Sequence, residues 1–327
     1  MKKRILLLFG GETSEHNVSV MGYEYVSSLL RNTEYDILPT YVSHSGEWYL
    51  GGADGERAYL CASNGSLYTS GEFVKIDAAI PLLHGKGGED GKIQGALDVA
   101  GIPYVGADAT TSAVCIDKSY TKAVAESLGI PTVPSVVFSK ETDVARAYEL
   151  CAKKLGEKMF IKPCRLGSSV GASPVYNEAD FYTFFPLAME KGDNMVMVER
   201  LIERKREIEC AFYQTSIRHF ITPPGEILIG GFYGYDEKYG GKTHVSPIAD
   251  VDAKIRERAV EYSTLLSEAL RLRHLGRIDF FLSDGEIYFN EINTFPGFTH
   301  ESLYPRMLEA YGLPPREALL SIIGEIC

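Results

Sequence analysis

Two pairs of polar residues interrupt an apolar hairpin pattern near the C-terminus of this 327-residue chain. Arg277 and Asp279 stand two positions apart in the first strand of the pattern, and Glu291 and Asn293 have the same spacing in the second. Because residues two apart in a strand share a face, the members of each pair point to the same side. Two carboxylates and an amide oxygen form a hard-oxygen set that suits Mg²⁺. The alternative is a structural ion pair of Arg277 with Asp279 or Glu291.

A second candidate site begins at Lys162, which ends a predicted buried strand and is followed by the small-residue loop Gly167–Gly171. Backbone N–H groups in such a loop can cradle phosphate, and the lysine adds a point charge. The alternative is a plain turn.

Two further charged positions carry weaker signals. Lys118 lies within a helical pattern, where a lysine is otherwise a solvated surface residue. Glu199 stands at a strand end beside apolar residues, with Glu207 and Glu209 downstream. Such carboxylates could hold ribose hydroxyls or an adenine amino group. The order of these features along the chain is a stronger signal than any one of them.

The elements that must position these residues follow from the hydrophobic pattern. In the first hundred residues, strand-like and helix-like segments alternate, which predicts a βαβ-type domain with ligand-binding loops at the strand ends. The predicted segments are strand Ile5–Phe9, helix Val18–Leu30, strand Ile76–Leu83 and helix Ile93–Ala100.

The rest of the chain divides into two further predicted units. The second holds helix Thr111–Leu128, strand Ser135–Phe138, helix Asp143–Leu155 and strand Met159–Lys162. The third holds strand Glu207–Tyr213, the glycine-rich stretch Gly230–Gly241, helix Ala253–Leu270, and the hairpin strands Arg277–Leu282 and Glu286–Asn293. We therefore predict an α/β protein with units at residues 1–105, 106–202 and 203–327.

Composition narrows the class of protein. The net charge of −11 argues against a general nucleic-acid-binding role, which needs a basic face. No stretch approaches the roughly 20 apolar residues of a membrane span. The apolar run Ile5–Phe9 is also shorter than the roughly 7–15 residues of a signal-peptide core. Six cysteines without a C-x-x-C pair favour reduced thiols in the cytoplasm.

Several longer motifs occur in a fixed order over nearly the whole chain. They are Gly10–Ser19, His84–Gly95, Pro103–Gly106, Asp117-Lys118, Lys162–Gly171, Glu237–Tyr239, Gly276–Asp279 and Asn290–Gly297. Together they resemble the motifs of bacterial D-alanine–D-alanine ligases, which have the ATP-grasp fold. The resemblance implies a Rossmann-like N-terminal domain followed by a two-part ATP-grasp module, whose last part carries the metal site and a mobile loop.

The resemblance implies ATP-dependent joining of two D-alanine molecules through an acyl phosphate, for peptidoglycan precursor synthesis. It implies ATP contacts from Lys118, Lys162, Glu199, Ile202, Glu207 and Lys238. It implies two Mg²⁺ ions, replaceable by Mn²⁺, held by Asp279, Glu291 and Asn293. We also expect a homodimer, with small molecules as the other partners and no contact with nucleic acid or membrane.

The same resemblance implies roles for residues around the two amino acids. Glu15, Val18 and His84 would receive the first D-alanine, and Ser302 and Leu303 the second. Arg277 and the N–H group of Gly297 would stabilise the oxyanion, as preorganised donors do. Ser168, Tyr239 and Glu15 would link the mobile loop to the first substrate.

The sequence leaves the identity of the second substrate open. Relatives linked to vancomycin resistance often carry histidine at the position of Tyr239 and arginine at that of Leu303, so this chain resembles the dipeptide-forming type. We expect D-alanine as the second substrate, with D-serine as the alternative. An apolar pocket discriminates poorly against an added hydroxyl.

Departures from the family pattern leave some assignments open. Glu301 puts an acid beside the second-substrate pocket. The segment Glu199 to Glu207 is one residue longer than usual, so either Glu207 or Glu209 could bind ribose. Rival interpretations are another ATP-grasp ligase, or a catalytically silent ATP-binding regulator that should have lost a metal ligand or Arg277.

Overall fold

The N-terminal sheet is built around β1 (Arg4–Gly10), in which residues 5–8 are fully buried. The computed structural model describes residues 2–192, 194–228 and 244–327. Strand β1 pairs in parallel with β2 (Asp36–Val42) and with β7 (Ala78–Leu83). Helix α1 (His16–Leu29) follows β1, and α2 (Lys92–Val99) follows β7. The predicted strands and helices at these places are confirmed, and burial on both faces explains the continuous apolar run of β1.

The predicted alternation of strands and helices is wrong between residues 36 and 75. After β2 the chain forms only strands there, namely β3 (Trp48–Leu50), β4 (Glu56–Cys61), β5 (Ser66–Thr69) and β6 (Glu72–Lys75). They extend the sheet in antiparallel fashion, in the order β6-β5-β4-β3-β2-β1-β7. Antiparallel strands need only a short turn between them, so no crossover helix is required. These strands are also short and partly exposed, and they lack the apolar runs that marked β1 and β7.

The predicted continuous helix Thr111–Leu128 is also wrong, because it is two helices, α3 (Ala109–Cys115) and α4 (Lys118–Ser127). Asp117 between them has an extended backbone, and its side chain accepts a hydrogen bond from the N–H of Ser119 at 3.0 Å. Asp117 is therefore the N-cap of α4. The N–H of Lys118 donates to the carbonyl of Cys164 at 3.0 Å, which ties the break to the loop after β9.

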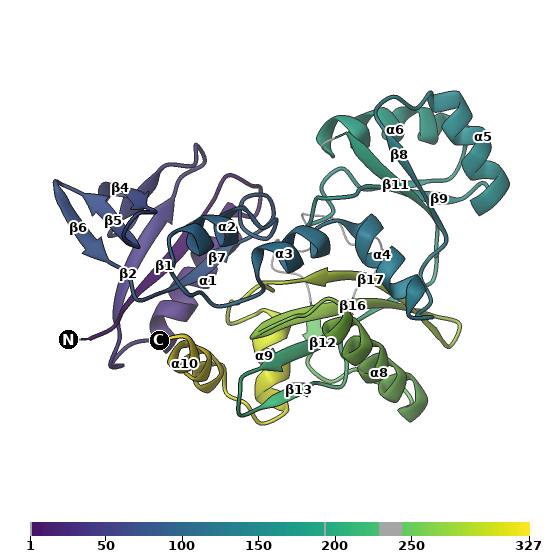
Figure 1. The fold of residues 1–327 in the computed structure, drawn as a ribbon. Helices are drawn as coiled ribbons and strands as arrows, with labels where there is room; N and C mark the ends of the chain where they lie inside the picture. Colours follow the sequence, from purple (N-terminus) through teal and green to yellow (C-terminus); the bar gives the residue numbers. More distant parts are fainter. Residues whose placement is uncertain (1, 193, 229–243) are drawn as a thin grey trace.

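A four-stranded sheet with order β10-β9-β11-β8 forms the central part of the chain, drawn at the upper right of Figure 1. Its strands are β8 (Ser135–Ser139), β9 (Met159–Pro163), β10 (Ser173–Val175) and β11 (Met195–Arg200). Helices α5 (Val144–Leu155) and α6 (Glu178–Lys191) pack on it through a shared apolar core. The predicted strands and helix of this region are confirmed.

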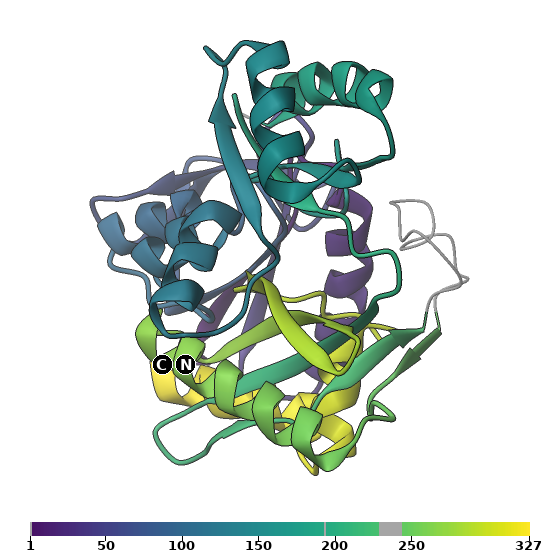
Figure 2. The same ribbon diagram turned by 90° about the vertical axis from the view of Figure 1, so that its right-hand side faces the viewer.

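A six-stranded sheet lies below the four-stranded one in Figure 2. Its strands are β12 (Arg206–Gln214), β13 (His219–Ile221), β14 (Gly225–Leu228), β15 (His244–Ser246), β16 (Leu275–Ser283) and β17 (Glu286–Asn293). The helices of this part are α8 (Ala253–Ala269), α9 (Leu303–Ala310) and α10 (Pro315–Ile326). The predicted strand, helix and hairpin are confirmed, whereas the stretch Gly230–Gly241 lies outside the described residues.

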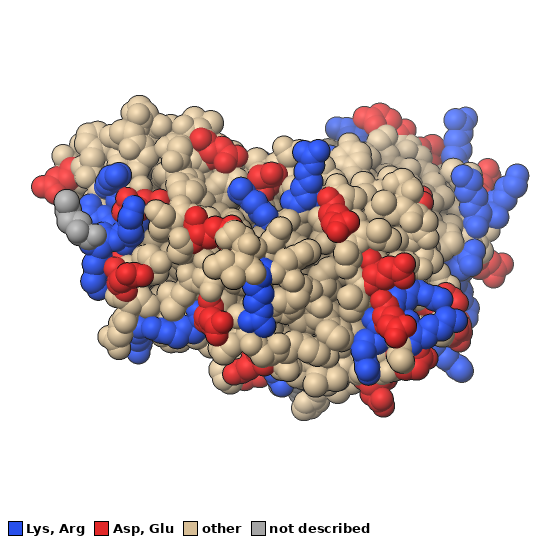
Figure 3. Space-filling view, turned by 60° about the horizontal axis from the view of Figure 1, so that its bottom comes forward, with Lys and Arg blue, Asp and Glu red and all other residues tan. Residues whose placement is uncertain are grey.

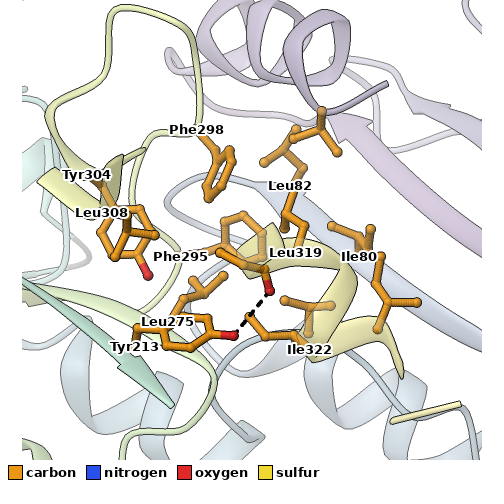
Figure 4. Close-up of a cluster of buried hydrophobic side chains, with 14 of the residues drawn as sticks. Ile80, Leu82, Tyr213, Leu275, Phe295, Phe298, Tyr304, Leu308, Leu319 and Ile322 are labelled. Carbon is orange, nitrogen blue, oxygen red and sulfur yellow. Dashed lines mark hydrogen bonds between the residues drawn. The ribbon is translucent and has the colours of Figure 1, made fainter. Parts of the chain in front are cut away.

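One apolar core joins the beginning and the end of the chain (Figure 4). Ile80 and Leu82 of β7 belong to the same buried cluster as Leu319 and Ile322 of α10, together with Phe295 from the segment after β17. Because these side chains are packed together, the segment that follows β17 is held against the N-terminal sheet. The division into units at residues 105 and 202 stays a prediction.

The surface mixes the two signs of charge. On the face shown in Figure 3, lysines and arginines lie among aspartates and glutamates. Within the described part of the chain, no helix is both long and apolar enough to cross a bilayer.

Candidate active site

A cavity of about 820 Å³ lies where residues of all three sheets and their loops meet. The predicted site residues that line it are Glu15, Val18, His84, Lys118, Lys162, Ser168, Glu207, Arg277, Asp279, Glu291, Asn293, Gly297, Ser302 and Leu303. Two others, Glu199 and Ile202, are not among its lining residues. Lys238 and Tyr239 lie outside the described residues. The fold therefore gathers most of the predicted site into one cavity, although the residues are far apart in sequence.

One wall of the cavity rests on a buried carboxylate between two lysines. Glu199, near the end of β11, is 2% exposed and forms ion pairs with Lys122 and with Nζ of Lys162, the latter at 2.9 Å. Burial raises the pKa of Glu199, but the two lysines outweigh it and hold the pKa at about 2. Glu199 is therefore ionised, and it fixes the direction of Lys162 from behind the cavity wall.

Lys118 joins this wall from the start of α4. Its Nζ donates to the carbonyl of Leu166 at 2.8 Å and lies 3.1 Å from Oε2 of Glu291. Burial lowers the pKa of Lys118, but the charge of Glu291 and its hydrogen bond, together with the charge of Glu199, outweigh burial, and the net pKa is raised. This lysine is thus a buried, charged group rather than a solvated surface residue.

A second wall of the cavity holds one arginine between two carboxylates. Arg277 donates to Asp279 from Nε at 2.8 Å and from Nη2 at 2.7 Å. Its Nε also lies 3.1 Å from Oε2 of Glu209. Burial lowers the pKa of Arg277, and the two carboxylates raise it well above its ordinary value. The ion pair of Arg277 with Asp279, an alternative left open by the sequence, is present.

The three predicted metal ligands lie side by side on this wall. Asp279 pairs in register with Glu291 across β16 and β17, and Nδ2 of Asn293 donates to Asp279 at 2.9 Å. Among the described residues, no group of three or more His, Cys, Asp or Glu is arranged to hold a metal ion. The predicted set contains two carboxylates and an amide, and its donor chemistry fits Mg²⁺. A divalent cation at this place would have to compete with Arg277 and Lys118 for the carboxylates.

The loop after β9 reaches the N-terminal domain through a hydrogen bond between Ser168 and Glu15. Oγ of Ser168 donates to Oε1 of Glu15 at 2.5 Å. Ser168 and Ser169 both have a positive φ, 51° and 57°, a backbone conformation uncommon for residues other than glycine. The added Cβ of any residue replacing Gly167 would lie 3.4 Å from Oε2 of Glu15, so the loop packs closely over that carboxylate.

Glu89 is a buried carboxyl that sequence reasoning did not single out. It accepts hydrogen bonds from the N–H groups of Gly85 at 2.8 Å and Phe295 at 3.3 Å. Burial, together with the charge of Glu15, raises its pKa to about 8. Burial also lowers the pKa of the nearby His84, which favours the neutral imidazole.

Another part of the cavity is built from the start of α9. Ser302 is the N-cap residue, and its Oγ accepts a hydrogen bond from the N–H of Thr299 at 3.0 Å. Leu303 is 5% exposed and presents an apolar side chain to the cavity. The side chain of Glu301 is 83% exposed and lies 3.9 Å from Arg306. A smaller cavity of about 300 Å³ lies alongside and is lined by both Glu301 and Arg306.

Other residues of the site were missed by sequence reasoning. Lys122 stands four positions after Lys118, so both lie on one face of α4, and this spacing could have identified it. Lys205 lies over the ring of Phe281 at 3.7 Å and forms an ion pair with Glu207 at 3.0 Å. No sequence pattern pointed to Lys205, because its contact with Phe281 depends on the pairing of β12 with β16.

The arrangement defines a class of protein. Lysines on one wall, acidic oxygens on the other and a small-residue loop between them suit a nucleotide with its phosphates and divalent cations. An N-terminal Rossmann-like domain followed by two sheets that enclose such a cavity is the architecture of the ATP-grasp ligases. The predicted fold class is thereby confirmed.

Comparison with known proteins narrows this class to one family. The family described as D-ala D-ala ligase N-terminus matches residues 4–107, and D-ala D-ala ligase C-terminus matches residues 124–324. This chain belongs to the D-alanine–D-alanine ligase family. The D-alanine–D-alanine ligase of Thermoanaerobacter pseudethanolicus is 37% identical to it, over 95% of this chain and 92% of the relative. That of Vibrio campbellii is 37% identical over 99% of both chains.

Solved structures agree with the sequence relatives. D-alanyl-alanine synthetase A from Vibrio cholerae superimposes with a TM-score of 0.90 at 33% identity, over 100% of this chain and 99% of that one. The VanG D-Ala:D-Ser ligase from Enterococcus faecalis superimposes with a TM-score of 0.89 at 32% identity, over 100% of both chains. The family predicted from the motifs is confirmed.

Proposed function

We propose that this protein joins two D-alanine molecules into D-alanyl-D-alanine, converting ATP to ADP and phosphate, and so supplies a peptidoglycan precursor. The observation that carries the proposal is the hydrogen bond between Ser168 and Glu15 at 2.5 Å. It joins a loop suited to phosphate to a carboxylate suited to an ammonium group, within one cavity. A nucleotide site alone would need no such carboxylate.

In the first step, Glu15 holds the ammonium of the first D-alanine, beside Val18 and His84. An oxygen of the substrate carboxylate attacks the γ-phosphorus of ATP, the bond to ADP breaks, and an acyl phosphate forms. Lys118 and Lys162 neutralise charge on the phosphates, and Glu199 holds Lys162 in place.

The other nucleotide contacts belong to the proposal as well. Glu207 accepts from the ribose hydroxyls, Ile202 lies against the adenine, and Lys238 reaches the γ-phosphate. The glutamate choice follows from the side chains, because Glu209 lies within an ion-pair distance of Arg277 whereas Glu207 lies beside Lys205.

In the second step, the neutral amine of the second D-alanine attacks the acyl carbonyl. As the tetrahedral intermediate collapses, the nitrogen loses a proton and phosphate leaves. Arg277 and the N–H of Gly297 stabilise the oxyanion. Ser302 and Leu303 receive the second substrate, and Tyr239 completes the link through Ser168 to Glu15.

Asp279, Glu291 and Asn293 would hold two Mg²⁺ ions, with Mn²⁺ able to replace them, and these ions would supply positive charge that neutralises the phosphates. A homodimer and a cytoplasmic location remain part of the same proposal.

A product assay tests the proposal directly. The protein is incubated with ATP and Mg²⁺, and with D-alanine alone or paired with D-serine or D-lactate. Phosphate release is followed, and products are identified by mass. We expect D-alanyl-D-alanine as the main product, since Leu303 presents a methyl-compatible wall. Phosphate release only with another amino acid would contradict the substrate, and a mixed product with D-serine in excess would favour the alternative acceptor.

A further inference from the structure

We infer that Glu209 is a positioning residue that keeps Arg277 directed into the cavity when Asp279 binds a cation. The inference rests on the proposed role of Arg277 at the oxyanion. It assigns a function to a carboxylate that the nucleotide and metal contacts described above leave unused.

The first step of the argument is the placement of Glu209. It stands on β12 directly opposite Asp279 of β16, and the two strands pair in register. Its side chain is 4% exposed, and Oε2 lies 3.1 Å from Nε of Arg277. Burying a carboxylate is unfavourable unless a cation compensates it, and Arg277 supplies that compensation.

The second step concerns competition for Asp279. At present both Nε and Nη2 of Arg277 donate to this carboxylate, at 2.8 and 2.7 Å. A divalent cation on Asp279 would draw on the same oxygens and would repel the guanidinium. Nε already lies between Asp279 and Glu209, so a small rotation lets it donate fully to Glu209. The arginine then stays charged, paired and directed into the cavity.

The third step provides a control that separates loss of the contact with Arg277 from loss of one negative charge in the cavity. Glu207 lies two residues earlier on the same face of β12 and also lines the cavity. Its ionic partner is Lys205 at 3.0 Å. Glu207→Gln is therefore a matched control, because it removes one carboxylate from the same face without touching the contact with Arg277.

The first measurement separates turnover from substrate affinity. Glu209→Gln keeps the size of the side chain and removes its charge. We expect kcat to fall about 10–100-fold, as for other residues that hold a reacting group in place, with KM for ATP nearly unchanged. Glu207→Gln should instead raise KM for ATP with a smaller effect on kcat. Equal kcat and KM changes in the two variants would overturn the inference.

The second measurement does not depend on activity. Binding of Mn²⁺ is titrated by electron paramagnetic resonance at saturating ADP. Without Glu209, Arg277 must remain on Asp279, so the Mn²⁺ dissociation constant should rise about tenfold in Glu209→Gln. In Glu207→Gln it should change much less. An unchanged Mn²⁺ affinity in Glu209→Gln would overturn the inference.

A double variant tests whether the effect runs through the arginine. If it does, the double variant Glu209→Gln/Arg277→Lys should have nearly the same kcat as Arg277→Lys alone. If the two residues act independently, the fold-decreases in kcat of the two single variants should multiply. Should Glu209→Gln fail to fold, Glu209→Asp keeps the charge at shorter reach, and the same comparisons apply. Normal turnover in Glu209→Gln with an inactive Arg277→Ala overturns this inference alone. Normal turnover in Arg277→Ala overturns the proposed role of Arg277 itself.

Discussion

Each of the two walls of the cavity is organised around one charged side chain, and the two central charges have opposite signs. On one, a buried carboxylate, Glu199, holds two lysines, and on the other a partly buried arginine, Arg277, holds two carboxylates. The first wall has an excess of positive charge and suits phosphate oxygens. The second has an excess of negative charge and suits divalent cations. The central side chain on each wall thus fixes the direction of the oppositely charged side chains around it. Its sign therefore decides whether the wall attracts anions or cations.

The walls also differ in what a ligand would have to displace. Lys162 is held from behind by Glu199, so its contact with phosphate need not break that pair. Asp279 instead has both oxygens engaged by Arg277. The lysine wall is therefore preorganised, whereas the acidic wall must exchange partners when a cation binds.

The largest expected effect is on the stability of the lysine wall. Glu199→Gln leaves two lysines without their buried counter-ion and should lower the free energy of unfolding by about 3–5 kcal/mol. Chemical denaturation of the variant measures this. Glu203→Gln is the control, because Glu203 and its partner Lys158 are more than half exposed and such pairs contribute about 1 kcal/mol or less. Similar losses in the two variants would contradict the central role of Glu199.

The same carboxylate predicts a pH dependence of stability. The pKa of Glu199 is about 2 in the folded protein, against an ordinary value of 4.5. Because the folded-state pKa is lowered, its contribution is complete above pH about 4.5 and is lost as the pH falls toward 2. Unfolding of the wild type should show this loss, and Glu199→Gln should show a flatter profile in that window. Identical profiles would argue against an ionised Glu199.

On the acidic wall, the expected effect is on turnover. Arg277→Ala removes a preorganised donor, so kcat should fall about 10²–10³-fold with ADP binding largely retained. Steady-state kinetics and calorimetry measure the two quantities. Arg258→Ala, which removes a pair with the exposed Glu286, should leave turnover near that of the wild type. Unchanged turnover in Arg277→Ala would show that Arg277 forms only a structural ion pair on this wall.

A smaller effect is expected where the loop after β9 meets the N-terminal domain. Ser168→Ala removes the hydrogen bond to Glu15, and a bond to a charged group contributes about 1.5–3 kcal/mol. We expect KM for the first D-alanine to rise about tenfold or more. Ser169→Ala controls for backbone strain, since its φ of 57° is close to the 51° of Ser168. Equal effects of the two substitutions would show that the hydrogen bond between Ser168 and Glu15 is not what sets this KM.

The smallest effect is expected beside the start of α9, at the exposed Glu301. Glu301→Ser should change the ratio of D-serine to D-alanine incorporation by about fivefold or less, because the contribution of an exposed charge is about 0–1 kcal/mol. Competition assays with both amino acids measure this ratio. No change at all would show that Glu301 does not shape the second-substrate pocket.

Sequence reasoning succeeded where a local pattern carried the structure. The run of apolar residues in β1, the apolar hairpin pattern of β16 and β17, and the two-residue spacing of the polar pairs within these strands are all local. It failed for β3 to β6, whose residues are partly exposed and carry no strong period. It also failed at Asp117, where one side chain caps a new helix inside a continuous helical pattern.

What the sequence by itself determined was the family, the set of chemical groups and most of the elements that carry them, because motif order and periodicity are properties of the chain alone. Only the tertiary structure decided the partners of the buried ions. Lys122 meets Glu199, and Glu209 meets Arg277, through contacts between helix and sheet or between paired strands that are distant in sequence. Buried charges must find counter-ions, but which ones they find depends on how the three sheets pack around the cavity.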